Sequence, residues 1–191
     1  NIFENNLLLW SNEAFQELIK KQQTLFENIT DKLHIPREID SKSTFGDLDI
    51  VVPLQFLQPM VSLVKSLELP LSINTNVISY QYEGYQVDLI FLEEKFIPYA
   101  INYFSFGDHG NVLGRLSKCH GLKTGFKGLY HTFTRDQGNT KIDIPVTMDY
   151  TEMLEYLKYD SNKFKEGFKD ELDLFEWLTS SPYFDPTIYS F

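Results

Sequence analysis

With 191 residues, 42% of them apolar, the chain can bury the core of one domain or of two small lobes that share a cleft. Its 27 acidic and 17 basic residues give a formal net charge of −10, which works against non-specific binding to a polyphosphate backbone or an anionic membrane and makes any nucleic-acid contact local. The single cysteine, Cys119, excludes an internal disulfide and a thiolate-rich zinc site.

The first half of the chain is predicted to alternate helices and strands. Apolar residues from Phe15 to Leu33 recur at helical spacing after Ser11, a good helix cap, and predict a long amphipathic helix. Residues 48–53, LDIVVP, predict a strand, and residues 58–69 predict a second helix. Residues 76–94 contain two β-rich runs around a Glu-Gly turn, which is typical of a hairpin.

The second half is predicted to contain four helices and one more hairpin. No internal repeat is visible, and no apolar run reaches the length of a membrane span, so we expect no membrane partner. The use of one cysteine favours a reducing intracellular compartment, the cytoplasm or the nucleus. The expected helices are 94–105, 110–120, 149–159 and 162–178, and the hairpin arms are 129–134 and 141–146.

Two carboxylates stand at the entry of the first predicted strand. Successive side chains of a strand alternate between its faces, so Asp47 and Asp49 project the same way while Leu48 and Ile50 pack behind them. Two close carboxylates repel each other, and a shared proton, a basic partner or a divalent cation must offset the repulsion. Mg²⁺ prefers carboxylate oxygens, but a turn rich in aspartate and glycine that opens a strand explains the pair equally simply.

Asp88 adds a third carboxylate, inside the otherwise apolar run YQVDLIFL. Its desolvation would be costly without a partner, which is either a lysine or arginine of a neighbouring element or a cation shared with other acids. If this hairpin arm lies beside the LDIVV strand, three acids converge and can hold two cations, one activating a hydroxyl and the other gripping a triphosphate.

The motifs FGDLDIVV, VDLI and YFSFGDHGNVLGR, taken in order, resemble the nucleotidyltransferase superfamily. Its hallmark is a small residue or glycine before Asp-x-Asp on one strand and a third acid on a later strand. Within it, the chain is most similar to the catalytic part of family X DNA polymerases, the polymerase β-like group. SKCHGL and IPVTMDYTEMLEYLKY resemble later segments of that family, and the similarity covers residues 36 to 160.

The resemblance implies an α+β fold: a polymerase β-like palm with a mixed sheet and flanking helices, plus a small C-terminal α/β lobe. Residues 1–35 would form an N-terminal helix that packs on the palm. Residues 36–105 would be the palm with the catalytic acids, and residues 106–191 a nucleotide-pocket or thumb-like lobe with the C-terminal helices.

The same resemblance assigns the acids a role. Asp47, Asp49 and Asp88 become the catalytic residues and the ligands of Mg²⁺, for which Mn²⁺ can substitute. Asp47 and Asp49 would bridge both cations, and Asp88 would bind only the cation that activates the hydroxyl and accept its proton. In-line attack at the α-phosphorus then releases pyrophosphate.

The implied nucleotide site draws on residues from several segments. In the family, an aromatic pair and a turn line the sugar, an asparagine reaches the base edge and an arginine lies near the nascent pair and template. Alternatively, the two aromatics are core, the asparagine caps a helix and the arginine is a surface charge. The matching residues, with the glycine before the acids, are Gly46, Tyr103, Phe104, Asp108, Asn111 and Arg115.

Two features of the family are missing from this chain. The superfamily usually has a Gly-Ser pair about ten residues before the acids that holds the β- and γ-phosphates, whereas this chain has PREIDSKS, so we expect Arg37, Ser41 and Lys42 to replace it. The family's amino-terminal lyase lobe and helix-hairpin-helix motifs are not recognisable.

The cluster of Lys118, Lys123 and Lys127 is expected to contact nucleic acid locally, or else to be a solvated loop.

The expected function is metal-dependent nucleotidyl transfer from a nucleoside triphosphate, dNTP or NTP, to a 3′-hydroxyl of a nucleic-acid primer on a template. Two alternatives remain open: transfer to RNA, tRNA, a protein or a small molecule, and a catalytically silent nucleotide-binding module of a larger assembly. The start at Asn1 suggests further domains of a longer chain. Three histidines, His109, His120 and His131, have no zinc-site spacing and receive no role.

Overall fold

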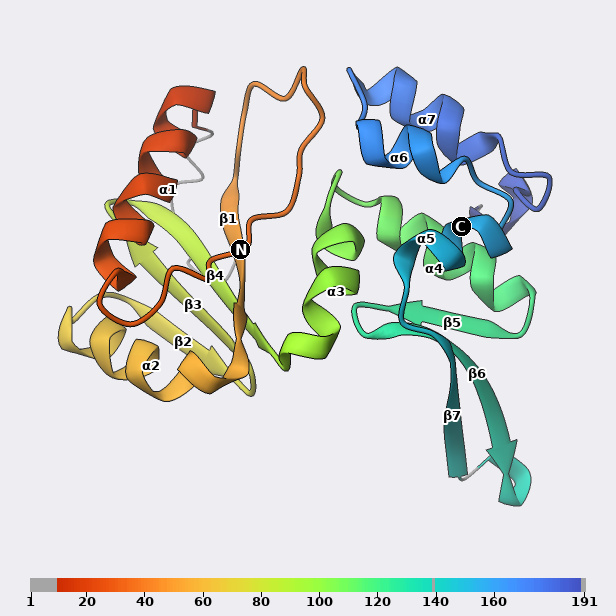
Figure 1. Ribbon diagram of the computed structural model, residues 1–191, viewed down its shortest axis with the longest axis horizontal. Coiled ribbons are helices and arrows are strands. Elements are labelled where there is room, and N and C mark those ends of the chain that lie inside the picture. Colours follow the sequence, from red (N-terminus) through yellow and green to blue (C-terminus); the bar gives the residue numbers. More distant parts are fainter. Residues whose placement is uncertain (1–9, 139, 190–191) are drawn as a thin grey trace. The chain divides into compact units, whose positions relative to one another are not determined.

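The computed structural model describes residues 10–138 and 140–189, and the chain divides into two compact units (Figure 1). Unit 1 is Asn1–Pro36 with Lys42–Ile97, and unit 2 is Arg37–Ser41 with Pro98–Phe191. Among the described residues, no helix is both long enough and apolar enough to cross a bilayer. The expected α+β class is confirmed, since each unit combines helices with its own sheet.

Unit 1 contains a mixed four-stranded sheet in the order β1-β4-β3-β2. The β1 and β4 strands are parallel, and the other two pairings are antiparallel. The predicted hairpin is β3–β4, whose turn residues Glu83 and Gly84 both have positive φ, as tight hairpin turns require. The strands are β1 Asp47–Pro53, β2 Leu71–Asn74, β3 Val77–Tyr82 and β4 Tyr85–Leu92.

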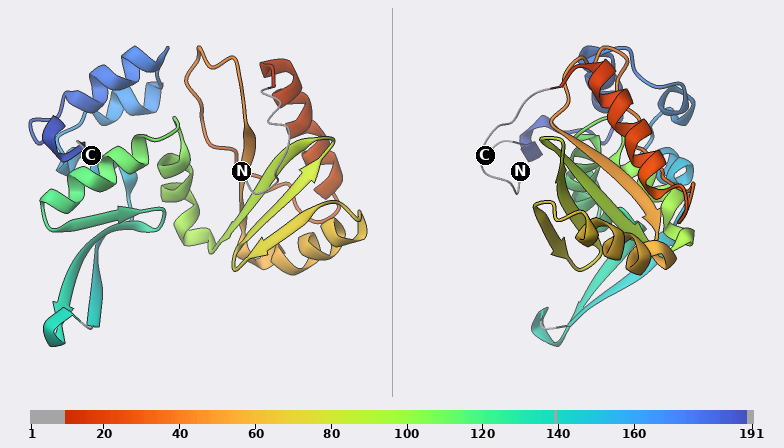
Figure 2. Two further views of the ribbon diagram at one scale, coloured as in Figure 1. Left: turned by 180° about the vertical axis from the view of Figure 1, so that it is seen from behind. Right: turned by 90° about the vertical axis from the view of Figure 1, so that its left-hand side faces the viewer.

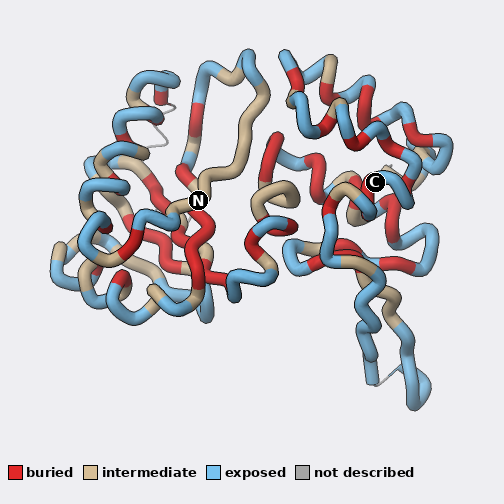
Figure 3. The backbone as a smooth tube through the Cα atoms, in the orientation of Figure 1, coloured by how far each residue is buried: buried red, intermediate tan, exposed pale blue. Residues whose placement is uncertain are grey.

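Two helices, α1 (Asn12–Phe26) and α2 (Leu57–Ser66), share one apolar core with one face of this sheet. That face consists of alternate residues of each strand, such as Leu48, Ile50, Val87 and Leu89, all fully buried. These core segments are the buried stretch of unit 1 in Figure 3. Because side chains alternate, the remaining residues of β1 and β4 point to the opposite face, where the acids lie.

The α1 helix starts where the sequence predicts but ends earlier. The Ser11 hydroxyl caps it by accepting from the Ala14 amide at 3.2 Å. The helix stops at Phe26, and the Ile29 and Thr30 amides both donate to the Phe26 carbonyl in the turn that follows. Ile29 and Leu33 still pack against the core, so their helical spacing reflects tertiary packing of a turn.

Unit 2 surrounds a three-stranded antiparallel sheet, β5-β6-β7, with five helices among the residues that the structure describes. Its core is rich in aromatic rings that meet edge-on or tilted. The helices are α3 Ile97–Phe104, α4 His109–Cys119, α5 Tyr150–Tyr156, α6 Ser161–Glu166 and α7 Glu171–Thr179. The strands are β5 Leu122–Gly125, β6 Gly128–Arg135 and β7 Thr140–Thr147.

Short 3₁₀ segments lie in both units. Those of unit 1 are Leu54–Phe56 and Glu94–Phe96, and those of unit 2 are Asp136–Gly138 and Pro186–Tyr189.

Two further details of the sequence prediction were wrong. The single helix expected over 162–178 is broken into α6 and α7 at Gly167, whose φ of 95° ends α6, and the Asp170 side chain caps α7 by accepting from the Asp173 amide. The β2 and β5 strands were missed, because four-residue strands carry too little alternation to be recognised.

The boundary between the units lies at Ile97 and Pro98, whereas the sequence analysis placed it after residue 105. The segment Arg37–Ser41 also belongs to unit 2, because its backbone is bonded there: the Asp40 amide donates to the Phe168 carbonyl at 2.9 Å and the Ser41 amide to the Lys169 carbonyl at 2.8 Å. Residues 1–9 and 190–191 of the expected domains lie outside the described residues.

Candidate functional site

The three acids meet on one face of the unit 1 sheet. The structure pairs β1 directly with β4, and the register sets Asp49 opposite Asp88 and Asp47 opposite Gln86. In a parallel pair, opposite residues project to the same face, so the three carboxylates and the Gln86 amide share that face. The long-range adjacency that the sequence analysis required is therefore present in the backbone.

The Asp88 carboxylate is held by neighbouring polar groups. The Gln86 side-chain amide donates to both of its oxygens, at 3.1 Å and 2.9 Å. The Ser79 hydroxyl, from the paired position on β3, donates to it as well. Among the residues that the structure describes, the groups bonded to Asp88 are thus two neutral donors on its own sheet, where the alternative expected a lysine or an arginine.

Burial raises the pKa of Asp88 above its ordinary value, because desolvation penalises the charged form. The hydrogen bonds from Ser79 and Gln86 oppose this by stabilising the carboxylate, and the negative charge of Asp47 raises the pKa further. A half-buried acid with a raised pKa beside two other acids is the kind of environment in which a carboxylate serves as a general base.

The donor set fits a hard divalent cation in its chemistry, since it offers only carboxylate oxygens. Among the residues that the structure describes, however, no three His, Cys, Asp or Glu side chains are arranged to hold a metal ion. The Asp88 oxygens are engaged by Gln86, and Asp47 is exposed. Each Asp88 oxygen keeps a lone pair beyond its bond to Gln86, so the amide can orient the carboxylate without blocking a cation.

We expect that Gln86→Leu raises the pKa of Asp88 further, because it removes two hydrogen bonds that stabilise the ionised carboxylate. A ¹³C NMR titration of the Asp88 side-chain carboxyl measures the change. Gln81→Leu is the matched control, since Gln81 is the β3 residue opposite Gln86. An Asp88 titration curve identical in the wild type and Gln86→Leu would show that the amide does not tune this acid.

The segment before β1 only partly provides the expected phosphate contacts. Lys42 belongs to unit 1, with its Nζ 5.0 Å from the centre of the Phe45 ring, whereas Ser41 belongs to unit 2. A Cβ built on Gly46 would meet no atom within 4 Å, so the backbone just before Asp47 is uncrowded.

Arg37, expected to contact phosphate, binds backbone carbonyls in the structure. Its guanidinium donates to the Phe164 and Lys165 carbonyls at 2.9 Å and 2.8 Å, and it lies over the Phe106 and Phe164 rings at 4.8 Å and 5.3 Å from their centres. Burial lowers its pKa. Arg37 is therefore a structural anchor of unit 2 whose donors are directed at backbone carbonyls.

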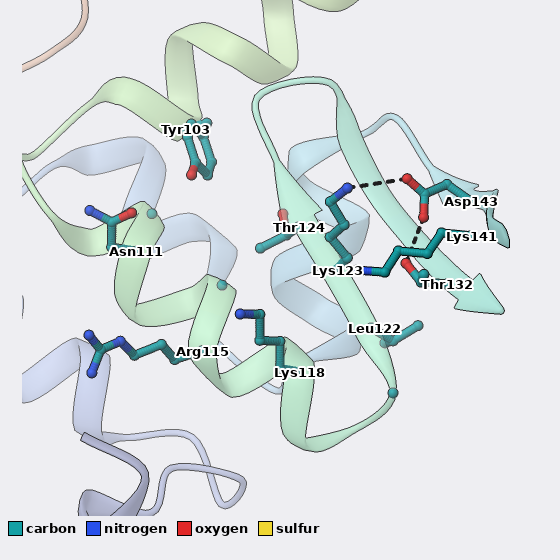
Figure 4. A pocket seen from close by; sticks show the side chains of 13 residues that line it. Tyr103, Asn111, Arg115, Lys118, Leu122, Lys123, Thr124, Thr132, Lys141 and Asp143 are labelled. Carbon is teal, nitrogen blue, oxygen red and sulfur yellow. Dashed lines mark hydrogen bonds and ion pairs between the residues drawn. The ribbon is translucent and has the colours of Figure 1, made fainter. Parts of the chain in front are cut away.

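Unit 2 has a groove of about 950 Å³ between α4 on one side and β5 with the β6–β7 hairpin on the other (Figure 4). It brings together five of the residues predicted to bind nucleotide or nucleic acid: Tyr103, Asn111, Arg115, Lys118 and Lys123. The remaining lining residues are Gly110, Gly114, Gly121, Leu122, Thr124, Thr132, Lys141 and Asp143.

The helical side of the groove follows from the spacing of its residues. Asn111, Arg115 and Lys118 stand four and three positions apart on α4 and so share one helix face. Tyr103 packs beside the first turn of this helix, where a Cβ on Gly110 would come within 2.7 Å of the Tyr103 carbonyl oxygen. Glycine at position 110 therefore permits the close approach that gives the groove its aromatic end.

Three of the predicted residues that follow residue 100 do not line the groove. Phe104 stacks on Phe126 with ring centres 6.1 Å apart, and the Lys127 Nζ lies 5.8 Å from the same Phe126 ring. Asp108 accepts from the Asn111 side-chain amide at 3.1 Å and so orients Asn111 at the start of α4. Phe104 and Lys127 therefore contact Phe126, and Asp108 acts on the groove only through Asn111.

Sequence reasoning missed the residues that the hairpin contributes, Thr132, Lys141 and Asp143. The signal was present in KIDIPV, where Lys141 and Asp143 alternate with isoleucines and so share a strand face.

Of the histidines without a role, His109 is buried in the core, where burial lowers its pKa to about 4. Its Nε2 is bonded to the Tyr150 hydroxyl at 2.6 Å.

A scan against protein-family models finds no family that matches the chain, and a search of curated proteins finds no match. Two groups of residues in the structure offer chemistry for a function. One is the carboxylate cluster of unit 1, and the other is the basic groove of unit 2.

Proposed function

We propose that this protein transfers a nucleotidyl group from a nucleoside triphosphate, dNTP or NTP, to the 3′-hydroxyl of a nucleic-acid primer, in the manner of a family X DNA polymerase. In this proposal unit 1 is the polymerase β-like palm. The observation that carries it is the direct pairing of Asp49 with Asp88 on parallel strands, with Asp47 on the same face. A cluster of repelling carboxylates at a sheet face is costly unless a ligand uses it.

In the proposed reaction Asp47, Asp49 and Asp88 would hold Mg²⁺, or Mn²⁺ in its place. The cation would neutralise triphosphate charge and lower the pKa of the attacking hydroxyl. An Asp88 oxygen would accept the proton of the 3′-hydroxyl, a role that its raised pKa favours. The bond from the 3′-oxygen to the α-phosphorus forms as the bond from that phosphorus to the pyrophosphate oxygen breaks, and pyrophosphate leaves.

The groove of unit 2 offers contacts suited to a nucleotide or a nucleic-acid strand. Tyr103 offers a flat face to a sugar or base, Asn111 offers a donor and an acceptor to a base edge, and Arg115 offers a fixed cation. Lys118 and Lys123 would contact the sugar-phosphate backbone. Ser41 and Lys42 stay as proposed phosphate contacts in place of the missing Gly-Ser pair.

A second candidate function is a catalytically silent module that binds a nucleotide within a larger assembly. It is favoured by the finding that, among the described residues, the acids do not form a three-carboxylate metal site. Such a module would use the basic groove but not the acids.

Incubation with Mg²⁺, labelled dNTPs or NTPs and a panel of acceptors tests the proposal. We expect extension of a primer on a template, with the added nucleotides set by the template. Transfer to RNA, tRNA, a protein or a small molecule instead would keep the chemistry and change the acceptor. No transfer with Mg²⁺ or Mn²⁺, together with nucleotide binding that ignores the metal, would favour the silent module.

A further inference from the structure

The β6–β7 hairpin is a long arm of unit 2 with little packing at its outer half. Each strand has eight residues, so the hairpin is about 25 Å long at roughly 3.3 Å per residue. It extends away from the helices of unit 2 in the views of Figures 1 and 2, and its described distal residues are exposed (Figure 3). An arm of this kind adds surface to unit 2 more than it adds core.

The two faces of the arm differ in chemistry. The register sets Thr132 opposite Asp143 and Thr134 opposite Lys141, so these four polar residues share one face. Phe133 lies opposite Ile142 on the other face. The polar face is the one that joins the groove, since Thr132, Lys141 and Asp143 all line it.

The charges of the groove are concentrated on its two walls. Arg115 and Lys118 come from α4, and Lys123 and Lys141 come from the sheet, against one carboxylate, Asp143, among the described lining residues (Figure 4). In a chain with a formal charge of −10, this is a local basic site of the kind that a polyanion would select.

Asp143 opposes this basic character from inside the groove. Its carboxylate accepts from the Thr132 hydroxyl at 2.7 Å and from the Lys123 ammonium at 3.2 Å. The hydrogen bonds from Thr132 and Lys123 lower the pKa of Asp143, so it is ionised at neutral pH. A phosphate that approaches Lys123 must therefore compete with a carboxylate that is already bound.

We infer that the polar face of the β6–β7 hairpin binds the sugar-phosphate backbone of a single nucleic-acid strand, with Lys141 as a phosphate contact and Asp143 as the residue that limits affinity by holding Lys123. The inference rests on the proposed function for the class of ligand. A strand fits better than a lone nucleotide because the cations come from three elements on both walls, and Thr134 continues the polar face outward from the groove.

The test is binding of a fluorescein-labelled single-stranded oligonucleotide, followed by anisotropy in EDTA so that no metal-dependent step contributes. Lys141→Ala should weaken binding several-fold and reduce the slope of log affinity against log salt by about 0.7, the share of one phosphate contact on a single strand. Asp143→Asn should strengthen binding, because it removes a negative charge and releases Lys123.

Matched controls separate these local effects from the change in net charge. Lys65→Ala on α2 of unit 1 and Asp185→Asn, which removes an exposed carboxylate bonded to Thr187, should leave affinity close to that of the wild type. Equal losses in Lys141→Ala and Lys65→Ala, or no gain in Asp143→Asn over Asp185→Asn, would overturn the inference. Variants that change the binding of a triphosphate but not of the oligonucleotide would overturn it as well.

The experiment distinguishes failure of this inference from failure of the enzymatic proposal. If the variants shift oligonucleotide affinity as expected while the wild type transfers no nucleotide, the hairpin contact stands and the enzyme proposal fails. If the wild type transfers nucleotides while both variants bind and transfer like it, the enzyme proposal stands and the hairpin contact fails.

Discussion

Asp88→Asn is expected to abolish nucleotidyl transfer while making the folded protein more stable at neutral pH. The loss of activity should be about 10²–10³-fold or more, the usual cost of removing one preorganised group that acts on transition-state charge. Asparagine keeps the size of the side chain but can neither accept the proton of the hydroxyl nor contribute negative charge to a cation site.

The gain in stability follows from the raised pKa of Asp88, whose first cause is burial. Below the ordinary aspartate pKa both the folded and the unfolded chain hold the proton, and Asp88 makes no difference to stability. As pH rises from there through the folded-state pKa, the unfolded chain releases its proton first, so the wild type loses stability. Asp88→Asn removes this loss, and its advantage should vanish in acid.

Urea unfolding of wild type and Asp88→Asn across a pH series measures the stability, and the primer-extension assay measures the activity. Asp31→Asn, an exposed aspartate of the same unit, is the control and should alter neither. Full activity in Asp88→Asn would end the proposed assignment of Asp88. An Asp88→Asn protein that is less stable than the wild type at neutral pH would contradict the desolvated carboxylate.

Phe164→Ala should destabilise unit 2 by about 3–5 kcal/mol, the typical cost of deleting a buried phenylalanine. The Phe164 ring is 2% exposed and lies 5.1 Å from the Tyr150 ring and 5.5 Å from the Trp177 ring, between centres. The Arg37 guanidinium also lies over it, at 5.3 Å. The substitution leaves a cavity and removes a cation–π contact of the segment that precedes the acids.

Urea titration followed by tryptophan fluorescence and circular dichroism measures the free energy of unfolding. The matched control is Phe175→Ala on α7, because that side chain is 58% exposed and should cost well under 1 kcal/mol. Similar losses for Phe164→Ala and Phe175→Ala would show that the aromatic cluster is not the stabilising core of unit 2.

Local signals in the sequence were enough for most elements of the fold. The Ser11 cap, the alternation in β1 and the Glu83-Gly84 turn each depend on a few neighbouring residues, and the structure has the start of α1, the strand and the hairpin where they were expected. Where tertiary contacts compete with local preference the prediction was wrong, as at Ile29, which keeps helical spacing in a turn that packs on the core.

The candidate site shows the same division. Alternation along one strand predicted from the sequence that Asp47 and Asp49 share a face, and the structure agrees. Asp88 stands beside them because β1 pairs with β4, a strand more than thirty residues further along the chain. The contact between Gln86 and Asp88 could likewise be seen only in the structure.

The sequence by itself determined the kinds of chemistry available to this protein. It contains three acids in β-rich runs, places Asn111, Arg115 and Lys118 on one helix face, and carries a net negative charge. Only the tertiary structure decided which of these groups meet. It turned Arg37 onto backbone carbonyls and brought Lys141 and Asp143 to the groove. The physical reason is that a side chain's face follows from local backbone geometry, whereas its partner is set by strand register and core packing between distant segments.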